Sequence, residues 1–171
     1  MGINTVSDII RVHGAGRSEH PALIQGDRRR SWGELLARAG QVANGLVAAG
    51  VGSQDRIAFL DKNGVEHFEV FYGAALLNAV CVDVNWRLAP PEVEYIVNDA
   101  EAKVLVVGHE FVPVLDAIAA NLTTVSTIIV IAPAGGEPSA THRDYESWVA
   151  SFPATDPGTP STSEDLSLIH I

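Results

Sequence analysis

The chain has 171 residues, of which 47% are hydrophobic and 19% charged, and its formal net charge at pH 7 is -10. This composition is typical of a globular protein and excludes a disordered chain, and the length suffices for one domain or for part of a larger one. The negative charge argues against a nucleic-acid partner, because the phosphates would be repelled.

The first predicted elements are a hairpin and an amphipathic helix. The stretch HPALIQGDRRRSWGELL indicates a short strand, a polar turn at Gly26 and Asp27, and a helix that begins after Ser31. Ser31 and Glu34 form a capping-box pattern, which satisfies two backbone donors at the start of the helix. The helix ends at Gly50. Apolar residues at helical spacing predict its buried face: Leu35, Leu36, Ala39, Val42, Ala43, Leu46 and Val47.

Short apolar strands then alternate with helices. The strands are predicted near residues 56–60, 80–84, 103–107 and 127–131. Three helices are predicted between them; the second begins at Pro90 and Pro91, and the third covers residues 111–122. Their predicted buried faces are Phe68, Phe71, Tyr72, Ala75, Leu76 and Ala79 in the first helix, Val93, Ile96 and Val97 in the second, and Phe111, Leu115, Ile118 and Ala119 in the third. Continuous apolar strands with helical crossovers predict an α/β fold with an open, mainly parallel sheet and helices on both faces.

The composition changes after Ala132. Five of the nine prolines fall between Pro133 and Pro160, which predicts a long surface connection. Within it, DYESWV indicates a short helix, and the closing LSLIHI indicates a strand. The chain is therefore divided into residues 1–132, a partial α/β subdomain, and residues 133–171, a Pro-rich connection followed by the start of the next strand.

Features of the whole sequence indicate a cytoplasmic location. A lone cysteine, Cys81, excludes an internal disulfide bond and is typical of a reducing compartment. It lies in the apolar run AVCVDV and is interpreted as a buried structural thiol. No stretch reaches the ~18 unbroken apolar residues of a membrane span, and the N-terminus lacks the pattern of a secretory signal.

No nucleotide, metal or nucleophile motif is recognised. HGAGRSE has Glu19 where a dinucleotide fingerprint requires a third Gly, and no G-x-x-x-x-G-K-[ST] loop occurs. The six histidines have no metal-ligand spacing, and His67 is interpreted as a surface residue on the polar side of its helix. The run Arg28-Arg29-Arg30 is interpreted as a solvated hairpin tip. No catalytic, cofactor-binding or metal-binding residue is therefore assigned.

A polar and aromatic cluster follows one predicted central strand. It consists of Asp83, Asn85, Trp86 and Arg87. The carboxyl ends of strands are where open α/β sheets bind ligands. The alternative is structural: Asn85 and Arg87 would hold the loop between strand and helix, with Arg87 near Glu92 or Glu94. The structural role is favoured, because loop anchoring is the commoner use of such residues.

Four motifs occur in a characteristic order over residues 20 to 107: SW-x-EL, GV-x-x-x-D-R-I-A, N-G-x-E and N-W-R-L-x-P-x-E-x-x-Y-I. In this order and spacing they resemble the large N-terminal domain of adenylate-forming enzymes, the AMP-dependent synthetase and ligase superfamily. The likeness is greatest to fatty-acid-type acyl-CoA synthetases. Two positions depart from the family pattern: Asn78 stands where a Gly is common, and Asp83 stands where a Pro is common.

The resemblance implies an ATP-dependent acyl-CoA synthetase. A carboxylate and ATP would give an acyl-adenylate and pyrophosphate, and coenzyme A would then form the thioester. ATP, Mg and coenzyme A are implied for the whole enzyme, with a small carboxylic acid as substrate, and no cofactor is expected in this chain. In the family, a strand like EDLSLI runs into a Ser/Thr/Gly-rich loop that holds the ATP phosphates. Because this sequence stops before such a loop, a truncated, inactive fragment is expected, with a sheet edge open to self-association or aggregation.

Two alternatives remain open. Within the enzyme class, the chain could come from an aryl-CoA ligase or a peptide-synthetase adenylation domain, because the acyl pocket is not encoded here. In a different class, it could be a complete, non-catalytic α/β module that binds a partner or a small ligand. An in-frame Ser/Thr/Gly-rich loop directly downstream would favour the enzyme, whereas a natural stop codon there would favour the binding module.

Overall fold

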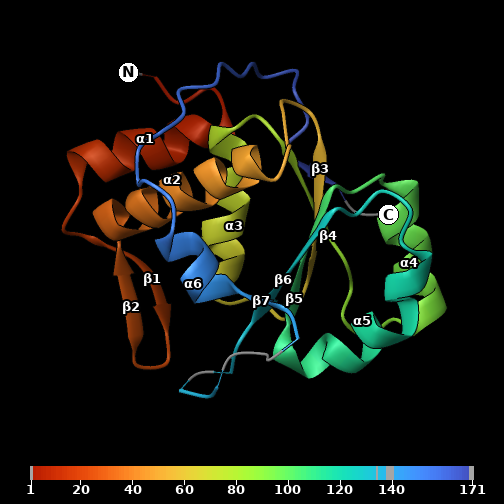
Figure 1. The fold of residues 1–171 in the computed structure, drawn as a ribbon. Coiled ribbons are helices and arrows are strands. Elements are labelled where there is room, and N and C mark those ends of the chain that lie inside the picture. The colour runs from red at the N-terminus through yellow and green to blue at the C-terminus, as the bar shows by residue number, and fades with distance from the viewer. Residues whose placement is uncertain (1, 134, 138–140, 170–171) are drawn as a thin grey trace.

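A parallel sheet runs through the middle of the computed structural model, which describes residues 2–133, 135–137 and 141–169 (Figure 1). The strand order is β7-β6-β5-β3-β4-β8, and each described pairing is parallel. The strands are β3 (Arg56–Leu60), β4 (Val80–Asp83), β5 (Val104–Gly108), β6 (Thr127–Ile131), β7 (Arg143–Asp144) and β8 (Leu168–Ile169). The four strands predicted between residues 56 and 131 are thus confirmed.

Helices cover both faces of this sheet (Figure 1). One face carries α2 (Trp32–Ala48), α3 (Val65–Leu76) and α6 (Tyr145–Ala150), with α1 (Val6–Gly16) packed on α2 and α3. The other carries α4 (Pro90–Asp99) and α5 (Val112–Ile118), with 3-10 turns at His109–Phe111 and Ala119–Asn121. A hairpin of β1 (Pro21–Gln25) and β2 (Arg28–Ser31) stands beside them. The predicted α/β fold class is therefore confirmed.

Alternation along the strands divides the core in two. In β3, Ile57 and Phe59 face the cluster beneath α2, α3 and α6, whereas Ala58 and Leu60 face the cluster beneath α4 and α5. Successive strand residues point to opposite faces, so a strand buried on both sides must be apolar throughout. This is why RIAFL and KVLVV read as continuous apolar runs. None of the described helices is long and apolar enough to cross a membrane.

Local signals set the helix starts. At α2 the backbone N–H of Glu34 donates to Ser31 Oγ (3.2 Å) and the backbone N–H of Ser31 donates to Glu34 Oε2 (2.8 Å), so the predicted capping box is present. Helix α1 was not predicted, although Thr5 and Asp8 form a second capping box and Ile10 is fully buried against α2 and α3. The same pattern that located α2 could have located α1.

Three predicted inward positions are wrong: Val47, Phe68 and Ala119 are exposed. In α2, the last turn meets Trp148 through Gly45, and Leu46 is buried, so Val47 turns away. Ala119 lies in a 3-10 turn, because the helical run ends at Ile118. The α3 error has a different cause, since the buried face of this helix includes a carboxylate.

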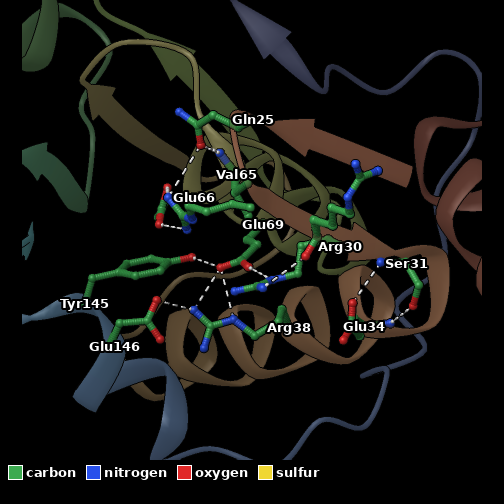
Figure 2. Close-up of polar contacts among 12 residues, drawn as sticks. Gln25, Arg30, Ser31, Glu34, Arg38, Val65, Glu66, Glu69, Tyr145 and Glu146 are labelled. Atoms are coloured by element: carbon green, nitrogen blue, oxygen red, sulfur yellow. Dashed lines mark hydrogen bonds and ion pairs between the residues drawn. The ribbon is translucent and has the colours of Figure 1, made fainter. Parts of the chain in front are cut away.

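That carboxylate belongs to Glu69, which is fully buried and bound from three other elements (Figure 2). Arg38 of α2 donates to Glu69 Oε2 from Nε (3.0 Å) and Nη2 (2.9 Å), and Arg30 of β2 donates to Oε1 at 3.4 Å. The hydroxyl of Tyr145 in α6 also donates to Oε2 (3.0 Å). Burial raises the pKa of Tyr145, and the Glu69 charge raises it further, so the phenol keeps its proton. A buried carboxylate needs such partners, because losing its hydration is costly.

The interpretation of the arginine run as a solvated hairpin tip holds for the exposed Arg29 but is wrong for Arg28 and Arg30. The run forms strand β2, and the turn lies at Gly26, which has φ 58°. Arg28 pairs with Glu66 and Arg30 with Glu69, so the strand is tied to α3. The interpretation failed for these two residues because a charge run in the sequence carries no sign of the glutamates that meet it in the fold.

The chain after Ala132 returns to the same sheet. It adds β7 at one edge, the predicted short helix as α6, and β8 at the other edge. Between them, Asn44 Nδ2 donates to the carbonyl oxygens of Pro153 (3.0 Å) and Thr155 (2.7 Å). The described part of the predicted final strand is confirmed as β8, whereas residues 170–171 lie outside the described residues.

Candidate functional site

Polar residues gather at the carboxyl ends of β3 and β5, where the order of the strands in the sheet reverses. These strands are neighbours, yet α3, which follows β3, lies on one face and α5, which follows β5, lies on the other. The loops therefore diverge and leave a crevice, which is the usual ligand site of an open α/β sheet. Asp61 follows β3, and Gly108 ends β5 so close to it that an added Cβ would lie 2.2 Å from Asp61 Cγ.

Two hollows open on either side of Asp61. One has a volume of about 690 Å³ and lies among the ends of β3, β5 and β6. The other has a volume of about 480 Å³ and lies between the ends of β3 and β4, with Phe59, His67 and Trp86 in its wall. Asp61 and Asn63 line both hollows. Their sizes fall within the ~300–1,000 Å³ range of small-molecule sites.

Asp61 is the electrostatically unusual group of this crevice. Its Oδ1 accepts the backbone N–H of Lys62 (2.7 Å), but it makes no ion pair with any described residue, since the Lys62 ammonium binds Glu110 instead. Burial raises the pKa of Asp61, and the charges of Glu110 and Glu66 act in the same direction. A carboxyl group with a raised pKa in a crevice is a candidate for ligand binding.

We expect Asp61→Asn to raise the free energy of unfolding at neutral pH by about 0.5 kcal/mol or less, because the group is only half-buried. The folded-state pKa is raised, so ionised Asp61 destabilises the fold above that pKa, and the penalty disappears as pH falls below it toward the ordinary value of 3.8. Urea denaturation at pH values from neutral to about 4 should show that the difference in unfolding free energy between the variant and the original chain decreases as the pH falls. Asp27→Asn, at an exposed position in the hairpin turn, is the control, and an equal gain there would contradict the prediction.

Asn85 holds the loop after β4 as expected. Its Oδ1 accepts the backbone N–H of Arg87 (3.1 Å), and its carbonyl accepts the N–H of Leu88 (3.1 Å). These bonds close a tight turn between β4 and α4. The predicted structural role is thus confirmed for Asn85, whereas all four residues of the cluster (Asp83, Asn85, Trp86 and Arg87) also line the hollow of about 480 Å³.

The prediction that Arg87 lies near the carboxylate of Glu92 or Glu94 is wrong. Its guanidinium instead lies 3.8 Å from the centre of the Trp86 ring, and the Lys62 ammonium lies 5.4 Å from the same ring. Glu92 is occupied with capping α4, since its carboxylate accepts the N–H of Ala89, and Glu94 accepts from Asn121. The aromatic face competes with these carboxylates for the cation.

His67 is not a surface residue. Its side chain is only 12% exposed, and its Nε2 lies 2.9 Å from Asp83 Oδ1. The ring packs between Phe59 and Phe68. The pairing explains how Asp83 is tolerated in a buried strand, because a carboxylate there needs a hydrogen-bond donor.

Cys81 has the environment of a structural thiol. It is buried, and its Sγ lies 3.5 Å from Asp83 Oδ1. Burial raises the pKa of this thiol well above its usual range, and the Asp83 charge adds to the rise. The thiol therefore stays protonated, as the sequence interpretation expects of a non-nucleophilic cysteine.

The described residues do not form a site that suits a nucleoside triphosphate or a metal ion. The crevice has the Asp61 carboxylate at its centre, where phosphates would be repelled, and the Lys62 ammonium is already paired with Glu110. Within the described ranges, no three His, Cys, Asp or Glu side chains are arranged to hold a metal. The sequence analysis did not identify Asp61 as a candidate residue. Asp61 directly follows the apolar strand RIAFL, and a position at the end of an apolar strand is also the signal by which Asp83 was identified.

Comparisons with known proteins point to one family. Residues 10–170 match the family model described as AMP-binding enzyme. The chain is 42% identical over 102 residues to the long-chain-fatty-acid–CoA ligase FadD13 of Mycobacterium tuberculosis (strain CDC 1551 / Oshkosh), a match covering 60% of this chain and 20% of that protein. It is 32% identical over 151 residues to the 3-hydroxybenzoate–CoA ligase of Aromatoleum sp. (strain CIB), covering 88% of this chain and 28% of that protein.

The fold has a close counterpart among solved structures. The anthranilate CoA ligase AuaEII, in complex with anthranoyl-AMP, superposes with a TM-score of 0.89 at 30% identity. The match covers 98% of this chain and 32% of that chain. The chain therefore spans between 20% and 32% of the length of these relatives.

Proposed function

Because the chain belongs to the AMP-binding enzyme family, we propose that it is part of an ATP-dependent acid ligase that forms acyl-adenylates. The observation that carries this proposal is the match of residues 10–170 to the family model. In the whole enzyme, a carboxylate would attack ATP, release pyrophosphate and form a mixed anhydride with AMP. Coenzyme A would then displace AMP and give the thioester. ATP, Mg and coenzyme A are thus the proposed cofactors of the longer protein.

The residues of this chain have a scaffolding role in the proposal. They build one sheet of the enzyme with its two helical layers and contribute one wall of a crevice at the carboxyl edge. The described residues do not form a phosphate cradle, so the chain alone is proposed to be inactive. Leu166, which precedes edge strand β8, and Leu168, which lies in it, are half-exposed and favour self-association of the isolated chain.

A long-chain fatty acid is the first proposed substrate, and an aryl acid is the second. Identity is higher to the fatty-acid ligase, at 42%, but the match to the 3-hydroxybenzoate ligase extends over more of this chain, 88% against 60%. The fatty-acid proposal rests only on the higher sequence identity to that relative, because the described residues show no contact that favours either acid. A non-catalytic α/β binding module is the alternative from another class.

The test uses a longer protein that carries these residues in frame. We expect carboxylate-dependent exchange between ATP and labelled pyrophosphate, with a higher kcat/KM for a long-chain fatty acid than for 3-hydroxybenzoate. The same protein without added carboxylate is the control. A preference for the aryl acid would move the proposal to the aryl-CoA ligases. An absence of exchange with both acids, in a folded protein that binds ATP, would contradict the adenylation proposal.

A further inference from the structure

Two residues with left-handed backbone angles lie beside the start of β8. Gln54 (φ 60°) precedes β3, and Asn78 (φ 57°) precedes β4. The backbone N–H of Gln54 donates to the Asn78 carbonyl (2.7 Å), and Gln54 Nε2 lies 3.2 Å from both the carbonyl oxygen and Oδ1 of Asn78. Asn adopts such an angle readily after a helix end, whereas for Gln it has an energetic cost, which these hydrogen bonds offset at Gln54.

Both side chains reach the segment that leads into β8. Gln54 Nε2 donates to the carbonyl of Leu166 (3.1 Å), and the backbone N–H of Leu166 donates to Gln54 Oε1 (3.2 Å). One side-chain amide thus pairs with the backbone of one residue, as a neighbouring strand would. Asn78 Nδ2 donates to Asp165 Oδ2 (3.3 Å) and to Ser53 Oγ (2.9 Å).

The described part of β8 has little else to fix its place. It pairs with β4 at Cys81–Leu168 and Val82–Ile169. Leu168 is 41% exposed, so this residue contributes little buried area to the attachment. A slip of one residue would reverse which side chains face the core. Among the described residues, the polar contacts just before β8 therefore add to its two paired positions and can select between registers.

We propose that Gln54 and Asn78 form a clamp that positions β8 on β4 and sets its register. The clamp lies outside the pairing of β3 with β4, so β8 can detach while that pairing remains.

Amide hydrogen exchange in the 171-residue chain tests the clamp with single-residue reporters. The Cys81 amide donates across β4 to the carbonyl of Ser167 (2.9 Å), and the Val84 amide donates to the carbonyl of Phe59 (2.9 Å). The first amide reports docking of β8, and the second reports the β3–β4 pairing. Both can be followed by NMR under native conditions in a dilute, monomeric sample, in which self-association at β8 does not contribute to the protection of Cys81.

The variants Gln54→Gly and Asn78→Gly remove the amides but keep the left-handed angles. We expect exchange at Cys81 to become roughly tenfold faster in each, which corresponds to about 1.4 kcal/mol, with exchange at Val84 unchanged. Glu101→Gly is the matched control, because Glu101 also has a left-handed angle (φ 50°) but its side chain pairs with Arg56. This control should leave both amides unchanged.

Two results would overturn the proposal. Exchange at Cys81 that stays the same in both clamp variants would mean that the clamp does not hold β8. Equal acceleration at Cys81 and Val84 would mean that β8 and the β3–β4 pair open together. The measurement uses no nucleotide, so its failure would leave the proposed function standing. Inactivity of the longer protein would in turn leave the clamp standing.

Discussion

Replacing Glu69 by Ala is expected to lower the free energy of unfolding by about 3–5 kcal/mol, the usual effect of removing one partner from a buried charge network. Glu69 is fully buried, and its carboxylate receives hydrogen bonds from Arg38, Arg30 and Tyr145 (Figure 2). Without it, the Arg38 guanidinium would keep only the exposed Glu146 as an ion-pair partner among the described residues. Loss of this carboxylate would weaken the contacts among α2, α3, α6 and β2 together.

Chemical denaturation at neutral pH, followed by circular dichroism, measures this effect. Glu146→Ala is the control: it removes the other carboxylate that binds Arg38, but this one is 58% exposed, and its loss should cost about 0.5 kcal/mol or less. Glu69→Gln keeps the shape of the side chain and one acceptor oxygen, so its loss of unfolding free energy should lie between those of Glu69→Ala and Glu146→Ala. Equal, small effects of Glu69→Ala and Glu146→Ala would show that the buried network does not stabilise the fold.

The alternation of strands and helices is predictable from local sequence. RIAFL at residues 56–60 is apolar at every position after the first, because both faces of β3 are covered. Pro90 and Pro91 open α4, where the missing N–H groups have no partner to lose. Signals of this kind lie within a few residues of the elements they define. They gave the strand positions and the fold class.

The faces of α3 were beyond local reasoning. Phe68 looked apolar enough to be buried and Glu69 charged enough to be exposed, yet Phe68 is 37% exposed and Glu69 is fully buried. The reason lies 31 to 76 residues away, where Arg38 and Tyr145 supply the donors. The His67–Asp83 pair follows the same logic, since its members come from α3 and β4. Long-range pairing can reverse the burial that hydrophobicity alone predicts.

The candidate site was predictable in part. The position of Asp83 at the carboxyl end of β4 follows from sequence, because the strand itself is evident. The crevice at Asp61 depends on β3 and β5 being neighbours with helices on opposite faces. The order of the strands is a property of the folded chain, and no sequence motif near Asp61 indicates it.

The isolated chain is expected to have no adenylation activity. Most of the rate of such a transfer comes from preorganised charge around the reacting phosphate. In the described crevice, the central group is a carboxylate with a raised pKa, and the nearby Lys62 ammonium is already bound to Glu110. An anion entering this site would meet repulsion where catalysis requires attraction.

The most direct test of the account is ATP–pyrophosphate exchange by the purified 171-residue chain, with several fatty acids and with 3-hydroxybenzoate. Circular dichroism should first establish that the chain is folded, so that inactivity reflects the site and not the loss of the sheet. We predict exchange no faster than in a reaction without protein. Reproducible, carboxylate-dependent exchange above that background would contradict the account, because it would require a nucleotide site within these residues.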